Sequence, residues 1–135
     1  RLAESYAMGV RAFNDPNAGI VYPSYGVHFE KQNPNSFIIF ADTNNNNQYN
    51  GNQEKVEEFI LSKATIADLC VETDSSPPGR CGLGDIDIVY ARPDPIITIK
   101  SQGGNVSDGA AIIESFGKRS SIIFWISNQV YVKKI

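Results

Sequence analysis

The stretch from Asp42 to Glu54 carries the residue types most able to bind a metal ion. Oxygen-bearing side chains recur there at every second position, as they do in calcium loops that direct their ligands inward. The predicted ligands are Asp42, Asn44, Asn46, Gln48, Asn50 and Glu54. Asn47 stands where such a loop usually has glycine, and Asn tolerates the left-handed backbone required at that position. The spacing predicts a Ca²⁺ site.

Two features of this loop predict that a bound Ca²⁺ is held weakly. Glu54 falls one residue later than the bidentate ligand of an EF-hand loop, and Asp42 and Glu54 are the only charged residues of the stretch. Calcium affinity follows the number of carboxylates and the rigidity of the site. The alternative is a solvated hairpin or interaction loop without metal, in which the asparagines form Asx-turns.

The two cysteines, Cys70 and Cys81, bracket a turn-forming stretch at residues 75–80 that contains two prolines and a glycine. Such a stretch can fold back and bring the two sulfurs into bonding range, so we predict a local disulfide. A disulfide persists outside the reducing cytoplasm, which predicts an extracytoplasmic location. The alternatives are two unpaired buried thiols and a zinc site, the latter disfavoured because no histidine lies beside the cysteines.

The other polar residues form no catalytic set that can be read from the sequence. His28 is the single histidine, and no local Ser-His-Asp or Cys-His spacing includes it, so we interpret it as structural or surface-exposed. Asp85 and Asp87 alternate with isoleucines, which predicts that both carboxylates lie on the exposed face of a solubilising edge strand. We therefore predict that the chain is not an enzyme and has no small-molecule substrate.

The charge balance excludes a general affinity for polyanions, because the chain has 12 basic and 15 acidic residues. The basic clusters flank the last predicted hairpin and consist of Lys118, Arg119, Lys133 and Lys134. They could converge on one patch that binds the phosphates of DNA. The alternative, which we favour, is an ordinary charged rim, because no aromatic residues are interleaved with these cations.

The elements that must position these residues begin with a predicted helix. Apolar residues recur at helical spacing at Leu2, Tyr6, Val10 and Phe13, and the turn formers of residues 14–17 end the pattern near Phe13. No N-cap residue precedes Leu2, so we expect residue 1 to lie inside a longer helix. The four apolar residues are predicted to pack this helix on the rest of the domain.

Short strands follow the helix. The predicted strands cover residues 25–29, 37–41, 56–61, 65–71, 85–90, 96–100, 110–116, 121–126 and 130–135. Short strands separated by turns indicate a sandwich or curled antiparallel sheet, and the last two form the clearest hairpin. The predicted fold class is thus α+β. Residues 1–135 form one domain, with a helix stub at 1–13 and a β-rich head at 20–135.

Taken in order, these segments resemble the type IV pilin superfamily, in particular its minor pseudopilins of the H type (GspH/FimT-like). Residues 1–10 look like the end of the family's long N-terminal helix, and residues 25–29 resemble the first strand of its head. Residues 40–44 are similar to the strand and loop of prepilin-type proteins, where an Asp/Asn-rich loop is sometimes proposed to hold calcium. The resemblance to the closing strands of the family's head covers residues 86–93, 96–99 and 122–132.

This resemblance implies a structural subunit of a type IV pilus-like or type II secretion-like filament. Its partners would be other pilin or pseudopilin subunits, and an upstream apolar helix would anchor it in the inner membrane before assembly. The head would then lie in the periplasm or on a surface filament. Two alternatives stay open, namely a minor pilin that binds DNA or another ligand through its basic rim, and a calcium-stabilised extracellular adhesion domain.

Overall fold

The computed structural model describes residues 12–71, 80–91, 96–102, 104–106, 108–125 and 129–134, and of residues 96, 121–125 and 129–134 it describes the backbone alone. All regular structure in these residues is β. The strands are β1 (Phe13–Asp15), β2 (Gly19–Val21), β3 (Ser24–Glu30), β4 (Ser36–Asp42), β5 (Lys55–Ile60), β6 (Thr65–Val71), β7 (Asp85–Ala91), β8 (Ile96–Ser101), β9 (Gly104–Val106), β10 (Asp108–Ser115), β11 (Lys118–Trp125) and β12 (Gln129–Lys134).

The predicted α+β class is therefore wrong for the part of the chain that the structure describes, which is all β. Phe13 was expected to end a helix, but it begins β1 and pairs with Val21 of β2. The turn formers after it close a hairpin, in which the Asn17 amide donates to Asp15 Oδ1 at 2.9 Å. Leu2, Tyr6 and Val10 lie outside the described residues, so their packing role stays untested. Nor do the described residues contain a helix able to span a membrane.

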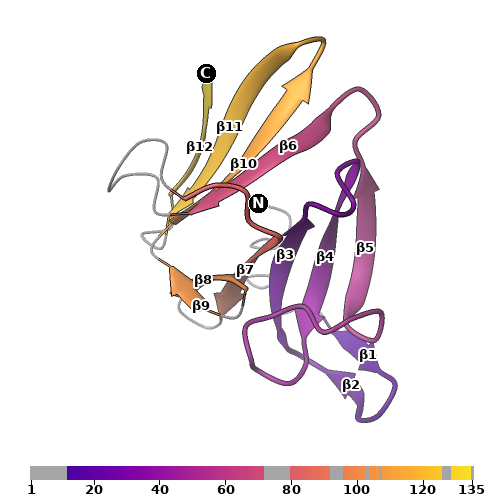
Figure 1. Ribbon diagram of the computed structural model, residues 1–135. Helices are drawn as coiled ribbons and strands as arrows, with labels where there is room; N and C mark the ends of the chain where they lie inside the picture. Colours follow the sequence, from indigo (N-terminus) through magenta and orange to yellow (C-terminus); the bar gives the residue numbers. More distant parts are fainter. Residues whose placement is uncertain are drawn as a thin grey trace.

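Two larger sheets and one small hairpin make up the fold (Figure 1). One sheet has six strands in the order β5-β4-β3-β7-β8-β9, the other has four in the order β12-β11-β10-β6, and every pairing is antiparallel. The chain passes from the first sheet to the second after β5 and returns after β6. The β5–β6 connection thus joins two edge strands, because β5 lies at one edge of the six-stranded sheet and β6 at one edge of the four-stranded sheet.

Alternating residues of both larger sheets fill one shared core. The buried apolar side chains of this core are Tyr25, Val27, Phe29, Ile39, Ala41, Ile66, Leu69, Val71, Leu83, Ile86, Ile88, Tyr90, Ile97, Ile99 and Ala111. Because these residues come from β3, β4, β6, β7, β8 and β10, apart from Leu83 just before β7, the two sheets pack face to face as a sandwich. Phe13 of β1 packs on the margin of the same core.

The predicted strands all correspond to observed ones, with ends shifted by a few residues. Residues 65–71 coincide with β6, and the predicted terminal hairpin is the β11–β12 pair, in which Ile123 lies opposite Tyr131. The sequence reading missed β1, β2 and β9. Each of these is three residues long, too short to display an alternating pattern.

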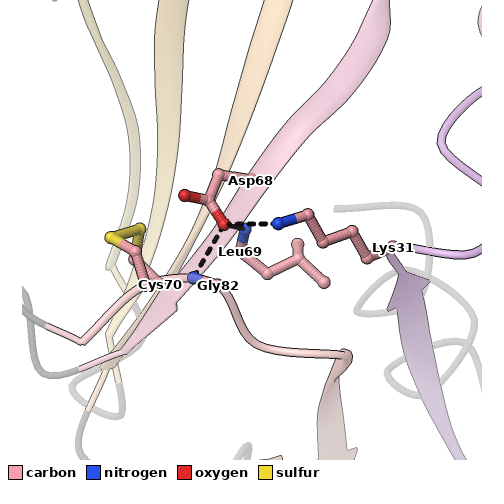
Figure 2. The surroundings of a disulfide bond; sticks show 6 residues. Lys31, Asp68, Leu69, Cys70 and Gly82 are labelled. Carbon is pink, nitrogen blue, oxygen red and sulfur yellow. Dashed lines mark hydrogen bonds and ion pairs between the residues drawn. A yellow bond between two sulfur atoms is a disulfide. The ribbon is translucent and has the colours of Figure 1, made fainter.

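The predicted disulfide is present between Cys70 and Cys81, with an S–S distance of 2.02 Å (Figure 2). Beside it, Asp68 Oδ1 accepts hydrogen bonds from the amides of Leu69 and Gly82, both at 2.8 Å, and lies 3.5 Å from Lys31 Nζ. Asp68 and the two sulfurs lie close enough to hold a metal ion, but the sulfurs are bonded to each other. Both alternatives, free thiols and zinc, are therefore excluded for this pair.

Candidate metal centre

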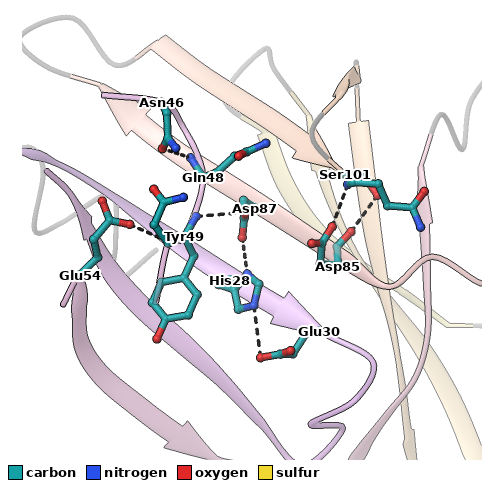
Figure 3. A network of polar contacts seen from close by, with 11 residues as sticks. His28, Glu30, Asn46, Gln48, Tyr49, Glu54, Asp85, Asp87 and Ser101 are labelled. Carbon is teal, nitrogen blue, oxygen red and sulfur yellow. Dashed lines mark hydrogen bonds and ion pairs between the residues drawn. The ribbon is translucent and has the colours of Figure 1, made fainter. Parts of the chain in front are cut away.

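The Asn-rich stretch is the long connection from β4 to β5, and it lies over the outer face of the six-stranded sheet. Tyr49 holds it there. The Tyr49 ring packs against Phe40 of β4 and His28 of β3, with ring centres 5.5 and 4.7 Å apart. The Tyr49 amide also donates to Asp87 Oδ2 of β7 at 3.2 Å (Figure 3). The loop is thus fixed to three neighbouring strands by one residue.

Oxygen atoms of this loop converge on the side-chain amide of Asn50. When this amide is turned with its nitrogen inward, the nitrogen lies 3.0 Å from Asn46 Oδ1, 3.1 Å from Gln48 O, 3.2 Å from Glu54 Oε1 and 3.3 Å from Asn44 Oδ1. Three of these four oxygens also accept from a backbone amide of the loop, and the side-chain amide nitrogens of Asn46 and Asn44 lie as near, at 2.9 and 3.0 Å. A cation at this point would attract all four oxygens at once. Gln48 contributes its backbone carbonyl, as the seventh residue of a calcium loop does.

The two carboxylates of the loop are buried and held by backbone donors. Asp42, at the end of β4, accepts from the amides of Asn46 at 3.2 Å and Asn47 at 3.0 Å. Glu54 accepts from the amides of Thr43 at 3.0 Å and Asn50 at 2.8 Å. Burial raises the pKa of both carboxyl groups, and these hydrogen bonds offset part of that rise. Neither carboxylate forms an ion pair with a described residue, so a bound cation would relieve the cost of burying them.

The loop backbone has the conformations that its residue types predicted. Asn47 has a φ of 61°, which confirms the expected left-handed conformation at the position usually held by glycine, and Asn45 has a φ of 57°. The asparagines also form Asx-turns, because Asn44 Oδ1 accepts from the Asn46 amide and Asn46 Oδ1 from the Gln48 amide. Turn formation and oxygen convergence therefore occur together in the same loop.

Below the loop lies a buried charged pair that the sequence reading missed. His28 Nδ1 is hydrogen-bonded to Asp87 Oδ1, and His28 Nε2 lies 3.4 Å from Glu30 Oε1 (Figure 3). Burial alone lowers the pKa of His28, but the hydrogen bond and charge of Asp87, together with Glu30, outweigh it and raise the pKa above 6.5. Burial also raises the pKa of Asp87, and the hydrogen bond and charge of His28 offset part of that rise.

The prediction that Asp85 and Asp87 share an exposed edge is accordingly wrong for Asp87. Asp87 is only 5% exposed, because β7 is a central strand and the loop covers its outer face. Asp85 is half-buried and accepts from the Gln102 amide at 2.8 Å. One local signal pointed to this burial: an aromatic residue, Tyr49, inside an otherwise polar loop indicates that the loop packs back on the protein.

The backbone brings the two predicted basic clusters to one end of the four-stranded sheet. Lys134 of β12 lies opposite Ser120 of β11, which places residues 133–134 beside residues 118–119. Arg119 Nε donates to Glu114 Oε2 at 2.9 Å, an ion pair that reduces the positive charge of this end. DNA binding by Lys118, Arg119, Lys133 and Lys134, the less favoured of the two interpretations, stays untested.

Comparison of the chain with protein-family models, with curated proteins and with solved structures returned no match. The resemblance to H-type pseudopilins is therefore still a prediction from the sequence. What the described residues offer chemically is a convergent set of oxygen ligands on a loop fixed to a rigid sheet.

Proposed function

We propose that this chain is a calcium-stabilised structural domain of an extracytoplasmic filament subunit of the pilin and pseudopilin kind, without a catalytic role. The single observation that supports it most is that four loop oxygens, from Asn44, Asn46, Gln48 and Glu54, lie within 3.3 Å of one point, the position of the Asn50 amide nitrogen. Ca²⁺ supplies a charge that all the oxygens share. In this proposal the ion fixes the β4–β5 loop on the sheet and so stiffens the domain.

The chemistry of the ligands favours Ca²⁺ over other metals. Every candidate ligand is an oxygen, from the carboxylates of Asp42 and Glu54, the amides of Asn44, Asn46 and Asn50, and the Gln48 carbonyl. Ca²⁺ accepts six to eight oxygens in a flexible arrangement, whereas Mg²⁺ demands a near-octahedral shell and keeps several waters. Zinc and copper prefer nitrogen and sulfur ligands. With two carboxylates, the expected affinity is that of extracellular calcium modules, with a Kd of about 10⁻⁴–10⁻³ M.

The filament part of the proposal draws on location and on the family resemblance. The Cys70–Cys81 disulfide fits an extracytoplasmic site, where free Ca²⁺ is also abundant enough for a weak loop. The segments that resemble the pilin head, residues 25–29 and 40–44, include parts of β3, β4 and the start of the calcium loop. Together these features favour a structural subunit over an adhesion domain of another kind.

Cell fractionation of a strain that expresses the complete gene tests this function. We expect the chain to appear in sheared surface filaments, or in a periplasmic filament when secretion components are overproduced, and to co-purify with other pilin-like subunits. A strain carrying Glu54→Gln should retain the chain at lower abundance, because the domain is less stable. Recovery of the chain only as a free monomer under all conditions would contradict the proposal.

A further inference from the structure

A bulky aromatic residue occupies the turn between β10 and β11, where the backbone disfavours it. Phe116 and Gly117 form this two-residue turn, with φ of 54° and 76°, between the paired residues Ser115 and Lys118. Hairpin turns with two positive φ values strongly prefer Asn, Asp or Gly at the first position. Phe116 is also 87% exposed, so packing in the core does not explain it. Contact with another molecule would explain it.

Phe116 borders a surface hollow of about 490 Å³ between the two larger sheets. The β5–β6 connection forms its floor, and Ile60, 69% exposed, lies on its other side. Lys63 in its lining and Lys118 just after the turn are exposed, and neither forms an ion pair with a described residue. We name this surface the Phe116 patch; its lining also includes Glu114, which pairs with Arg119, so Lys63 and Lys118 are the charged side chains there that form no ion pair with a described residue.

A second exposed apolar surface lies on the β1–β2 hairpin. Ile20 is 65% exposed and Tyr22, just after β2, is 57% exposed. Among the described residues, these two and the pair Ile60 and Phe116 are the large hydrophobic side chains that are mainly exposed. The nearest charge on the hairpin is acidic, Asp15 of β1. The β1–β2 hairpin and the β10–β11 turn lie at opposite ends of the molecule (Figure 1).

We infer that copies of this chain associate head to tail, with the β1–β2 hairpin of one copy seated on the Phe116 patch of the next. The two surfaces are complementary, because each offers apolar side chains and they carry opposite charges. Since they are different surfaces at opposite ends of the fold, the contact is heterologous and can repeat without closing. The inference rests on the proposed filament function and names the head contact that such a filament would use.

The contact should be weak in solution. Two exposed apolar side chains on each partner are far fewer than the roughly 20–30 residues per side of a stable complex. In a filament or on a membrane, however, the subunits are held at high local concentration, and weak contacts then become effective. Association of the isolated domain is therefore expected only in concentrated solution.

Cross-linking between two single-cysteine variants tests the contact. Ala18→Cys, in the β1–β2 turn, and Ser62→Cys, in the lining of the hollow, lie at exposed positions and leave Ile20 and Phe116 in place. The two variants carry different affinity tags and are mixed in concentrated solution with a short bismaleimide, which leaves the native disulfide intact. We expect cross-links between the two variants to be at least about tenfold more abundant than those within either variant alone, because a heterologous contact joins unlike surfaces. Asn105→Cys, exposed on β9 at the opposite edge of the six-stranded sheet from β5, gives the background. Equal yields for like and unlike pairs, or yields at background, would overturn the inference.

A second variant separates loss of contact from loss of folding. Phe116→Asn should raise Tm by roughly 2–4 °C, because Asn suits the left-handed turn position, and should also abolish the specific cross-link between Ala18→Cys and Ser62→Cys. Lys63→Glu should weaken association and Asp15→Lys should restore it. An unchanged cross-link in Phe116→Asn would count against the patch.

The outcomes for the contact and for the proposed filament function can be told apart. If cross-links form but the chain never enters filaments, the proposed function alone is wrong. If the chain enters filaments without these cross-links, the inferred contact alone is wrong.

Discussion

Gly26→Ala is expected to destabilise the domain, because the site has no room for a methyl group. A Cβ at Gly26 would lie 2.6 Å from Phe40 Cζ and 2.7 Å from the backbone oxygen of Ile88. Phe40 is fully buried and its ring packs against Tyr49, while Ile88 belongs to the adjacent central strand β7. The added methyl must therefore displace both the ring that supports the β4–β5 loop and a strand backbone.

The magnitude follows from two opposing effects. Overpacking of a filled site costs about 1–3 kcal/mol of unfolding free energy. Replacing Gly by Ala also restricts the unfolded chain, which returns about 0.4–1 kcal/mol. The expected net loss is about 1–2 kcal/mol, or a Tm lower by about 4–8 °C for a domain of this size. Because Phe40 supports Tyr49, the variant should also bind Ca²⁺ less tightly.

Thermal and urea unfolding, followed by tryptophan fluorescence and circular dichroism, measure this loss. Gly104→Ala is the matched control, since a Cβ there meets nothing closer than Ser101 O at 3.7 Å, and its stability should be unchanged or slightly higher. If Gly26→Ala melts within about a degree of the wild type, the packing of Phe40 over Gly26 is not as described here.

Three further perturbations address the disulfide, the loop and the buried pair. Cys70→Ser with Cys81→Ser should lower the unfolding free energy by about 2–3 kcal/mol, seen as a lower urea midpoint; an unchanged midpoint would mean that the bond adds nothing. Glu54→Gln should remove any rise in Tm on adding Ca²⁺, while the exposed control Glu57→Gln should retain it. Since the pKa of His28 is raised in the folded state, the stability it contributes is complete below about pH 6.5 and is lost as pH rises through the folded pKa. The free energy of urea unfolding, measured at pH values from about 5 to 9, should show this loss in the wild type and not in His28→Gln. Parallel pH profiles of the two proteins would contradict the prediction.

The strands were predictable because alternation is a local signal. The β7 pattern, for example, places Ile86, Ile88 and Tyr90 on one face, and all three lie in the core. The left-handed backbone of Asn47 was predictable from residue type alone, and so was the disulfide from the turn between its cysteines. These features depend on residues close together in the chain.

Features that depend on distant segments were not predictable in this way. Asp87 alternates with apolar residues as a solvent-facing residue would, and it is buried only because the β4–β5 loop covers β7. His28 and Asp87 meet because β3 pairs directly with β7, although β4, β5 and β6 separate these two strands in the sequence, and no local pattern encodes that pairing. Phe13 fitted a helical spacing, yet pairing with Val21 places it in a strand.

Calcium titration of the purified domain tests the central claim most directly. In calorimetry after removal of metal, we expect one saturable site per chain with a Kd of about 10⁻⁴–10⁻³ M, and much weaker binding of Mg²⁺. At about 10 mM Ca²⁺ a site with a Kd of about 10⁻⁴ M stabilises the fold by about 2.7 kcal/mol, so Tm should rise by several degrees and fall back with chelator. Asp42→Asn should lose both effects. No binding heat and no change in Tm at this concentration would contradict the account, and the Asn-rich loop would then be a network of Asx-turns without metal.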